Sequence, residues 1–177
     1  MEKLIRVLNG LSEWTGRGIA WFTLLMVVIT FLVVILRSMF NVGWIAMQES
    51  VTILHALTFL LGAAYTLKHD GHVRVDIFYH RMSQRNRALV DMFGTFFLLL
   101  PVCLFILFMS WDYVATSWSY QERSTESNLA WVYLLKTTML IMPLLLILQG
   151  FASFLTSLLI YLGRLAPTNE PERQEAG

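Results

Sequence analysis

The chain has 177 residues, of which 56% are hydrophobic and 14% are charged. Soluble domains carry about 25% charged residues, so this composition excludes an ordinary soluble protein and indicates a membrane protein. The formal net charge of +1 provides no basic surface for nucleic acid. Because Cys103 is the single cysteine, an internal disulfide and any site built from several cysteines are excluded as well.

Residues 1–17 mix charges with apolar residues at roughly helical spacing. This pattern predicts an amphipathic lead-in lying on the membrane surface, followed by a first membrane span over residues 18–40. A cleaved signal peptide is the competing interpretation. The apolar run is too long for a signal peptide and no Ala-x-Ala-like site ends it, so we expect the segment to be retained.

The first span carries a face of hydroxyl residues. Thr23 and Thr30 are seven residues apart and share this face with Arg37. Small and hydroxyl residues on one face of a membrane helix usually contact another helix rather than lipid. Arg37 lies near the outer end, where it either extends to lipid headgroups or pairs with an acidic residue such as Glu49.

A short turn ending in Trp44 joins the first span to a second over residues 45–67, which predicts an antiparallel hairpin. One stripe of the second span, defined by spacings of three and four residues, contains Gln48, Thr52, His55, Phe59 and Gly62. Unsatisfied polar groups are costly in hydrocarbon, so the stripe must face protein or water. The spacing leaves open whether the partner belongs to this chain or to another.

The segment over residues 67–81 is the most polar part of the middle of the chain and holds three of the four histidines. Its apolar residues share one helical face, which predicts a short amphipathic helix lying on the membrane surface. The residues expected to position this interfacial helix are Arg74, Asp76, Phe78 and Tyr79.

Ser83 is the expected N-cap of a helix that begins at Gln84. A third span follows over residues 89–112, with a kink at Pro101, and a fourth is predicted over residues 131–162, interrupted by Pro143. Residues 163–177 have the composition of a disordered tail. The fold class is therefore an all-α membrane protein with four transmembrane helices.

An even number of spans places both termini on one side of the membrane. Of the 13 lysines and arginines, all but Arg37, Arg123 and Lys136 fall on that side. The positive-inside rule therefore predicts that both termini, the interfacial helix and the tail are cytoplasmic.

The spans offer little chemistry of their own. Only His55 lies inside a span, so a haem held by two histidines of one chain is not expected. Ser50 and His55 point away from each other on a helix, and the acidic residues lie at span ends. We expect no catalytic residue, metal site, cofactor or substrate-binding residue, and hence an accessory subunit rather than an enzyme. The alternatives are a self-sufficient small homo-oligomeric transporter and, third, a membrane cytochrome or redox subunit.

Short motifs then follow one another along residues 18–162. They are Gln48-Glu49, Gly62-Ala63-Ala64-Tyr65, His69-Asp70-Gly71-His72-Val73-Arg74-Val75-Asp76, Arg87-Ala88-Leu89-Val90-Asp91, Glu122 with Ser124, and Leu148-Gln149-Gly150. In this order they resemble the DctQ-like small membrane subunit of tripartite ATP-independent periplasmic (TRAP) transporters. The most specific part is the run from His72 to Asp76. Gln84 departs from the proline often found there.

The resemblance implies a non-catalytic subunit in a bacterial or archaeal inner membrane. Such a subunit packs on a large multi-span subunit that moves an organic acid or related solute together with sodium. A periplasmic binding protein delivers the solute. On this basis the expected contacts with the large subunit are Thr23, Thr30, Gln48, Thr52, His55 and Gly62. The expected contacts with the binding protein are Trp44, Glu122, Arg123 and Glu126. Packing within the bundle competes for each of these residues.

Overall fold

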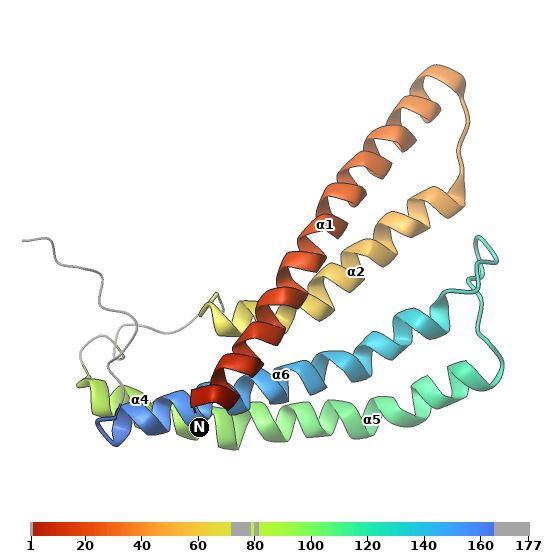
Figure 1. Cartoon of the computed structure of the whole chain (residues 1–177). Coiled ribbons are helices and arrows are strands. Elements are labelled where there is room, and N and C mark those ends of the chain that lie inside the picture. Colours follow the sequence, from red (N-terminus) through yellow and green to blue (C-terminus); the bar gives the residue numbers. More distant parts are fainter. Residues whose placement is uncertain (1, 72–78, 80–81, 165–177) are drawn as a thin grey trace, which may run out of the picture.

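The structure is a computed structural model that describes residues 2–71, 79 and 82–164 (Figure 1). The described part is helical and contains no strand: α1 is Glu2–Phe40, α2 is Ile45–Lys68, α4 is Gln84–Phe93, α5 is Leu100–Ser119 and α6 is Val132–Tyr161. A π-helical segment, η1 (Gly94–Leu99), joins α4 to α5, so that residues 84–119 form one membrane-length run. Four helices are long and apolar enough to cross a membrane, which confirms the predicted class and number of spans.

The first helix differs from the prediction. The lead-in and the first span form one continuous helix of 39 residues, so no helix end marks residue 17. Ser12 and Ile19, on either side of the expected boundary, are both buried. No proline separates the two parts, and packing against the rest of the bundle continues across the expected boundary. Residues 2–17 are therefore the first turns of α1.

Left-handed backbone residues end two of the helices. Asp70 (φ 52°) follows α2 and Gln121 (φ 48°) follows α5. The next amides, of Gly71 and Glu122, donate to the carbonyl oxygens of Thr66 and Ser117 at 2.9 and 3.0 Å. These bonds satisfy carbonyls that a helix end leaves open, as in a Schellman motif.

The third span is longer than predicted. It begins at Gln84, where the Ser83 hydroxyl accepts a hydrogen bond from the Asn86 amide at 3.4 Å, and it ends at Ser119. The predicted helix start at Gln84, with Ser83 as its N-cap, is confirmed, whereas polar residues after position 112 hid the far end of the span from the hydropathy pattern. The helix distorts in η1, directly before Pro101, which has no N–H to donate to the carbonyl one turn earlier.

The fourth span runs from Val132 to Tyr161 without a break, so the predicted interruption at Pro143 is wrong. Pro143 lies inside α6 and is fully buried. A proline removes one hydrogen bond from a helix, and packing on both sides keeps the chain helical here.

The central element of the bundle is α6, which packs against α1, α2, α4, η1 and α5. Its most apolar stretch is 33% buried, against 6% in each of the other three membrane-length helices. Figure 1 shows that the α1–α2 hairpin and the α5–α6 hairpin converge at one end and diverge toward the other. The first residues of α1 and the last residues of α6 lie at the converging end, which we call the terminal end. The turn 41–44 and the loop 120–131 lie at the other, the loop end.

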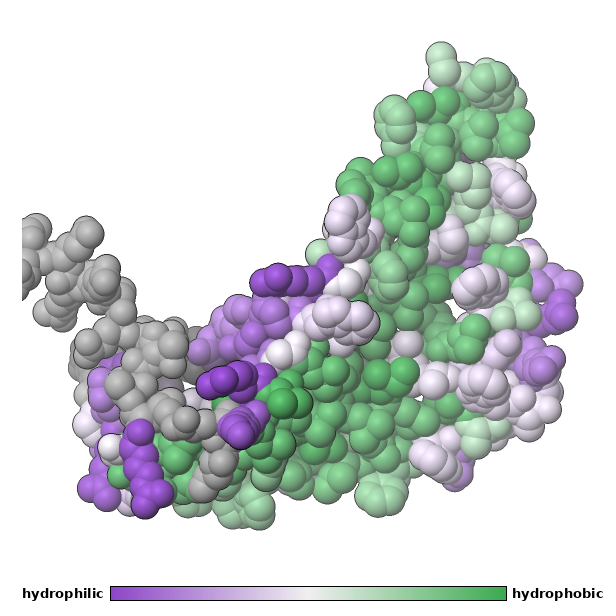
Figure 2. All heavy atoms as spheres, in the orientation of Figure 1, coloured by the Kyte–Doolittle hydropathy of each residue, from purple (hydrophilic) through white to green (hydrophobic). Residues whose placement is uncertain are grey.

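Much of the surface is apolar. Figure 2 shows hydrophobic residues in a broad band over both hairpins, with hydrophilic residues gathered toward the terminal end and at the loop 120–131. Large side chains of α1 and α5 are exposed in this band, among them Trp21, Phe31, Phe105 and Phe108. A band of this kind matches the hydrocarbon layer of a membrane.

Gly16 allows α1 and α2 to approach closely. A Cβ built at Gly16 would lie 2.1 Å from the Tyr65 ring, whereas one built at Gly18 meets nothing within 4 Å. We therefore expect Gly16→Ala to destabilise the protein in detergent by about 1–3 kcal/mol, the usual cost of overpacking. Gly18→Ala is the matched control and should leave stability unchanged or slightly higher. Thermal unfolding followed by circular dichroism measures both, and equal melting temperatures would contradict the close contact.

Candidate functional site

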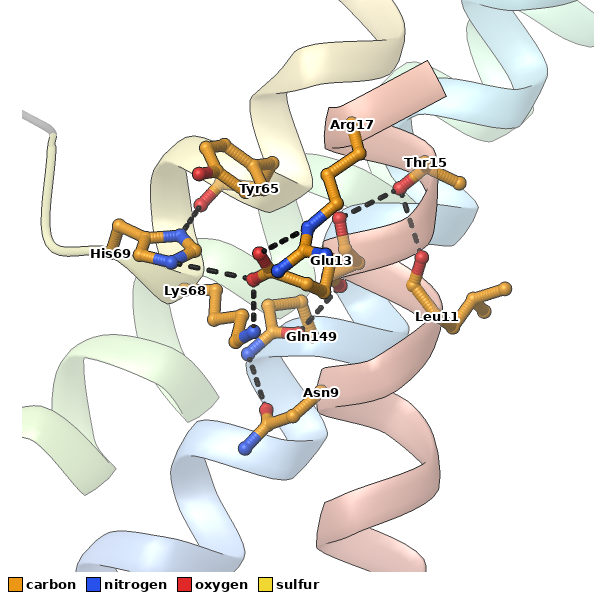
Figure 3. A network of polar contacts seen from close by, with 10 residues as sticks. Asn9, Leu11, Glu13, Thr15, Arg17, Tyr65, Lys68, His69 and Gln149 are labelled. Carbon is orange, nitrogen blue, oxygen red and sulfur yellow. Dashed lines mark hydrogen bonds and ion pairs between the residues drawn. The ribbon is translucent and has the colours of Figure 1, made fainter. Parts of the chain in front are cut away.

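A buried amide joins α6 to α1 at the terminal end. The Gln149 side chain is 2% exposed, its oxygen accepts from the Ser12 hydroxyl at 2.6 Å, and its nitrogen donates to the Asn9 side chain at 3.0 Å (Figure 3). Each polar group of the amide therefore has a partner from the lead-in. In the sequence, Gln149 was named only as part of the Leu148-Gln149-Gly150 motif, and spacing alone did not reveal its partners.

An ion-pair cluster next to this amide joins α1 to α2. The Glu13 carboxylate accepts from the Lys68 ammonium at 2.6 Å and from the Arg17 guanidinium at 3.2 Å, and the His69 ring nitrogen lies 3.4 Å away. Figure 3 shows these side chains converging on Glu13 from the two helices. His69 also stacks on Tyr65 with ring centroids 4.1 Å apart. Together with the Gln149 contacts, this cluster fixes the three helices at the terminal end.

A second polar cluster holds the loop end. The Glu122 carboxylate accepts hydrogen bonds from the Lys136 ammonium and, at 2.7 Å, from the Ser117 hydroxyl. The hydrogen bond from Lys136 and then that from Ser117 lower the pKa of Glu122 below its ordinary value. Lys136 also lies 3.9 Å above the centre of the Tyr113 ring. The hydrogen bonds of Glu122 therefore fix the loop between α5 and α6 to both helices.

The loop also reaches the first hairpin, because the Ser127 hydroxyl donates to the Glu49 carboxylate in the first part of α2. Glu49 thus has a partner other than Arg37, which is exposed. Within the loop, the Ser124 carbonyl accepts a hydrogen bond from the Asn128 amide at 3.0 Å. The Ser124 amide donates to the Leu129 carbonyl at 2.9 Å. The loop is a bonded turn held against both hairpins.

The residues expected to contact a binding protein fall into two groups. Arg123, Glu126 and Trp44 are exposed. Glu122 is half-buried and bonded to Lys136, so its side chain serves the loop itself. The contact from Ser127 to Glu49 brings this loop beside the start of α2, near Trp44.

The stripe on α2 faces outward. Gln48, Thr52 and His55 are exposed, and Phe59 is 74% exposed. The Thr52 hydroxyl lies 3.5 Å from the Gln48 backbone carbonyl, in the same helix. No other residue of the described part bonds the side chains of Gln48 and His55. Gly62 is half-buried and has nothing within 4 Å of an added Cβ, so the bundle itself does not require a glycine there.

Thr23 and Thr30 on α1 are exposed as well. The Thr30 hydroxyl donates to the Met26 carbonyl at 2.7 Å, which satisfies it within its own helix. The outward direction of Thr23, Thr30 and the α2 stripe means that packing within this bundle does not account for them.

The residues expected to position an interfacial helix lie largely outside the described residues: Arg74, Asp76 and Phe78. Tyr79 is described, and its hydroxyl donates to the Asp91 carboxylate at 2.7 Å. Its carbonyl accepts from the Arg87 guanidinium at 3.0 Å. Tyr79 is therefore attached to α4. The interfacial helix stays a prediction.

Among residues 2–71, 79 and 82–164, no group of three or more His, Cys, Asp or Glu side chains is placed to hold a metal ion. Within each polar cluster, at the terminal end and at the loop end, the charged side chains pair with one another. This arrangement suits a helical membrane protein that offers surfaces to partners.

Comparison with known families identifies which kind of membrane protein this is. The model of the family "Tripartite ATP-independent periplasmic transporters, DctQ component" matches residues 26–159, well over half of the chain. The chain belongs to this family of small TRAP transporter subunits. No curated protein and no solved structure matched the chain.

The anchoring role of Lys136 is testable through Glu122. Because the folded-state pKa of Glu122 is lowered, the contact stabilises the loop at neutral pH and this stabilisation disappears as the pH falls through the lowered value. We expect Lys136→Met to raise the pKa of Glu122 toward its ordinary value, because the largest cause of the shift is removed. Lys136→Arg, the control, should keep it low. Carboxyl carbon shifts measured by NMR during a pH titration decide the matter, and an unaltered pKa in Lys136→Met would refute the role.

Proposed function

We propose that this chain is the fixed, non-catalytic small subunit of a sodium-coupled TRAP transporter. The observation that carries the proposal is the exposed stripe of α2 on a chain of the DctQ family. Gln48 and His55 stand on an apolar helix where unsatisfied polar groups are costly. A large multi-span membrane subunit packing on this face supplies partners for them.

The other outward positions fit the same partner. Gly62 leaves room for a neighbouring helix to approach, and small residues are typical of helix contacts in membranes. Thr23 and Thr30 extend the surface to α1. Because α6 alone is substantially buried, the other helices have most of their surface available for lipid and for the large subunit.

We further propose that the terminal end is cytoplasmic and the loop end periplasmic in a bacterial inner membrane. The excess of lysine and arginine at the terminal end supports this orientation. Arg123, Glu126 and Trp44 then face the periplasm, where a binding protein loaded with an organic acid or related solute docks. The clusters around Glu122 and Glu49 hold that surface in one shape.

The role of the stripe can be measured by co-purification with the large subunit encoded alongside this chain. We expect Gln48→Leu and His55→Leu each to weaken recovery of the complex by about 3- to 18-fold, the range that corresponds to polar contacts of 0.6–1.7 kcal/mol in membranes. Membrane insertion should be unchanged, because both substitutions make the helix more apolar. Thr116→Leu, at an exposed hydroxyl residue on α5, is the control. Full recovery with both α2 variants, or solute uptake by this chain alone in liposomes, would overturn the proposal.

Substitutions in the proposed docking surface for the binding protein should change solute uptake without changing assembly with the large subunit. Arg123→Glu and Glu126→Lys should reduce the rate of binding-protein association and of solute uptake, with an effect that shrinks at high salt. Both side chains are exposed, so the complex with the large subunit should assemble normally. Arg164→Glu, at the terminal end, is the matched control. Uptake that is insensitive to both loop reversals would place docking elsewhere.

A further inference from the structure

A cavity of about 730 Å³ opens between the end of α2, α4, η1, the start of α5 and the last third of α6. Its lining changes character along its length. Charged residues line one end: Lys68, Asp70, Arg87 and Asp91. Apolar side chains line the other, among them Leu98 and Val102.

The change in polarity follows the membrane-length helical run 84–119. From Arg87 to Leu98 the run advances eleven residues, about 16 Å at 1.5 Å per residue. This distance is about half the thickness of the hydrocarbon core of a bilayer. The charged end lies near the start of the run, at headgroup depth, and the apolar end lies deeper. At that deeper end Leu98 is 70% exposed and Val102 54% exposed, so the cavity is continuous with the apolar surface.

Among the described residues that line it, the charged end contains two cations and two carboxylates, and Lys68 is also paired with Glu13 outside the lining. Three of these side chains are held in place by hydrogen bonds. Arg87 donates to the carbonyl oxygens of Tyr79 and Met82 at 3.0 and 3.1 Å. Asp91 accepts from Tyr79, and Lys68 pairs with Glu13. An anionic headgroup would meet Lys68 and Arg87 but would also meet two carboxylates. A headgroup that itself carries both charges matches the lining.

We propose that this cavity binds a bilayer phospholipid with a zwitterionic headgroup bearing a primary ammonium, as in phosphatidylethanolamine. The phosphate lies toward Lys68 and Arg87, and the ammonium donates to Asp70 and Asp91. Hydrogen bonds between charged groups are the stronger kind. One acyl chain follows Leu98 and Val102 into the hydrocarbon. The lipid fills the space between the third span and α6 and stabilises their packing.

Native mass spectrometry of the full chain, purified in detergent and incubated with equal amounts of phosphatidylethanolamine and phosphatidylglycerol, tests this. We expect phosphatidylethanolamine to be retained about tenfold more than phosphatidylglycerol, the factor expected from one charge-assisted contact. Asp91→Asn removes one carboxylate charge, keeps an oxygen that accepts from Tyr79, and should reduce this preference.

Leu98→Trp fills the apolar end without touching the charges and should abolish retention of the lipid. Leu104→Trp, at an exposed leucine of α5 that does not line the cavity, should retain it. Equal retention of both lipids by the unmodified chain would overturn the proposal. So would undiminished retention of phosphatidylethanolamine by Leu98→Trp.

Discussion

The buried amide of Gln149 determines how the helices are arranged. In a membrane the hydrophobic effect does not draw helices together, so packing and polar contacts must do so. Gln149 bonds Ser12 and Asn9, and Lys68 of α2 bonds Glu13, the residue that follows Ser12 in α1. All three contacts lie at the terminal end. The two hairpins are therefore held together there, and they diverge toward the loop end.

This divergence has a consequence for every other helix. Because only α6 is buried over a large part of its length, the faces of α1, α2 and α5 remain largely uncovered by the described part of the chain. Apolar side chains on these faces are satisfied by lipid. Gln48 and His55 are not, because lipid tails offer no hydrogen-bond partner. Under the proposed function, the outward polar stripe therefore marks the face that a protein partner covers, and the apolar faces are left to lipid.

The sequence alone predicted the elements whose polarity changes sharply. The start and end of α2 and of α6 were placed within one residue, because charged or aromatic residues flank both. The helix start at Gln84 was predicted from Ser83 as its N-cap, but the far end of the third span was underestimated because residues 113–119 are aromatic and polar. Pro143 was expected to break α6, but the packing that keeps this stretch helical depends on neighbouring helices. Periodicity placed His55 on the correct stripe, while the direction of that stripe and the partner of Gln149 depend on tertiary contacts that spacing does not contain.

Clusters at both ends also explain how such a thin bundle keeps one shape. The Glu13 cluster fixes α1 against α2 at the terminal end, and the contacts of Glu122 and Glu49 fix the loop against both hairpins at the loop end. A tilt of one hairpin relative to the other must break contacts at one of these ends. Both clusters lie at the ends of the spans. A contact far from the middle of a helix opposes tilting most strongly, because tilting displaces the ends the most. Such a bundle resists deformation while it presents a constant face, which under the proposed function is what a partner that moves solute across the bilayer requires of its fixed part.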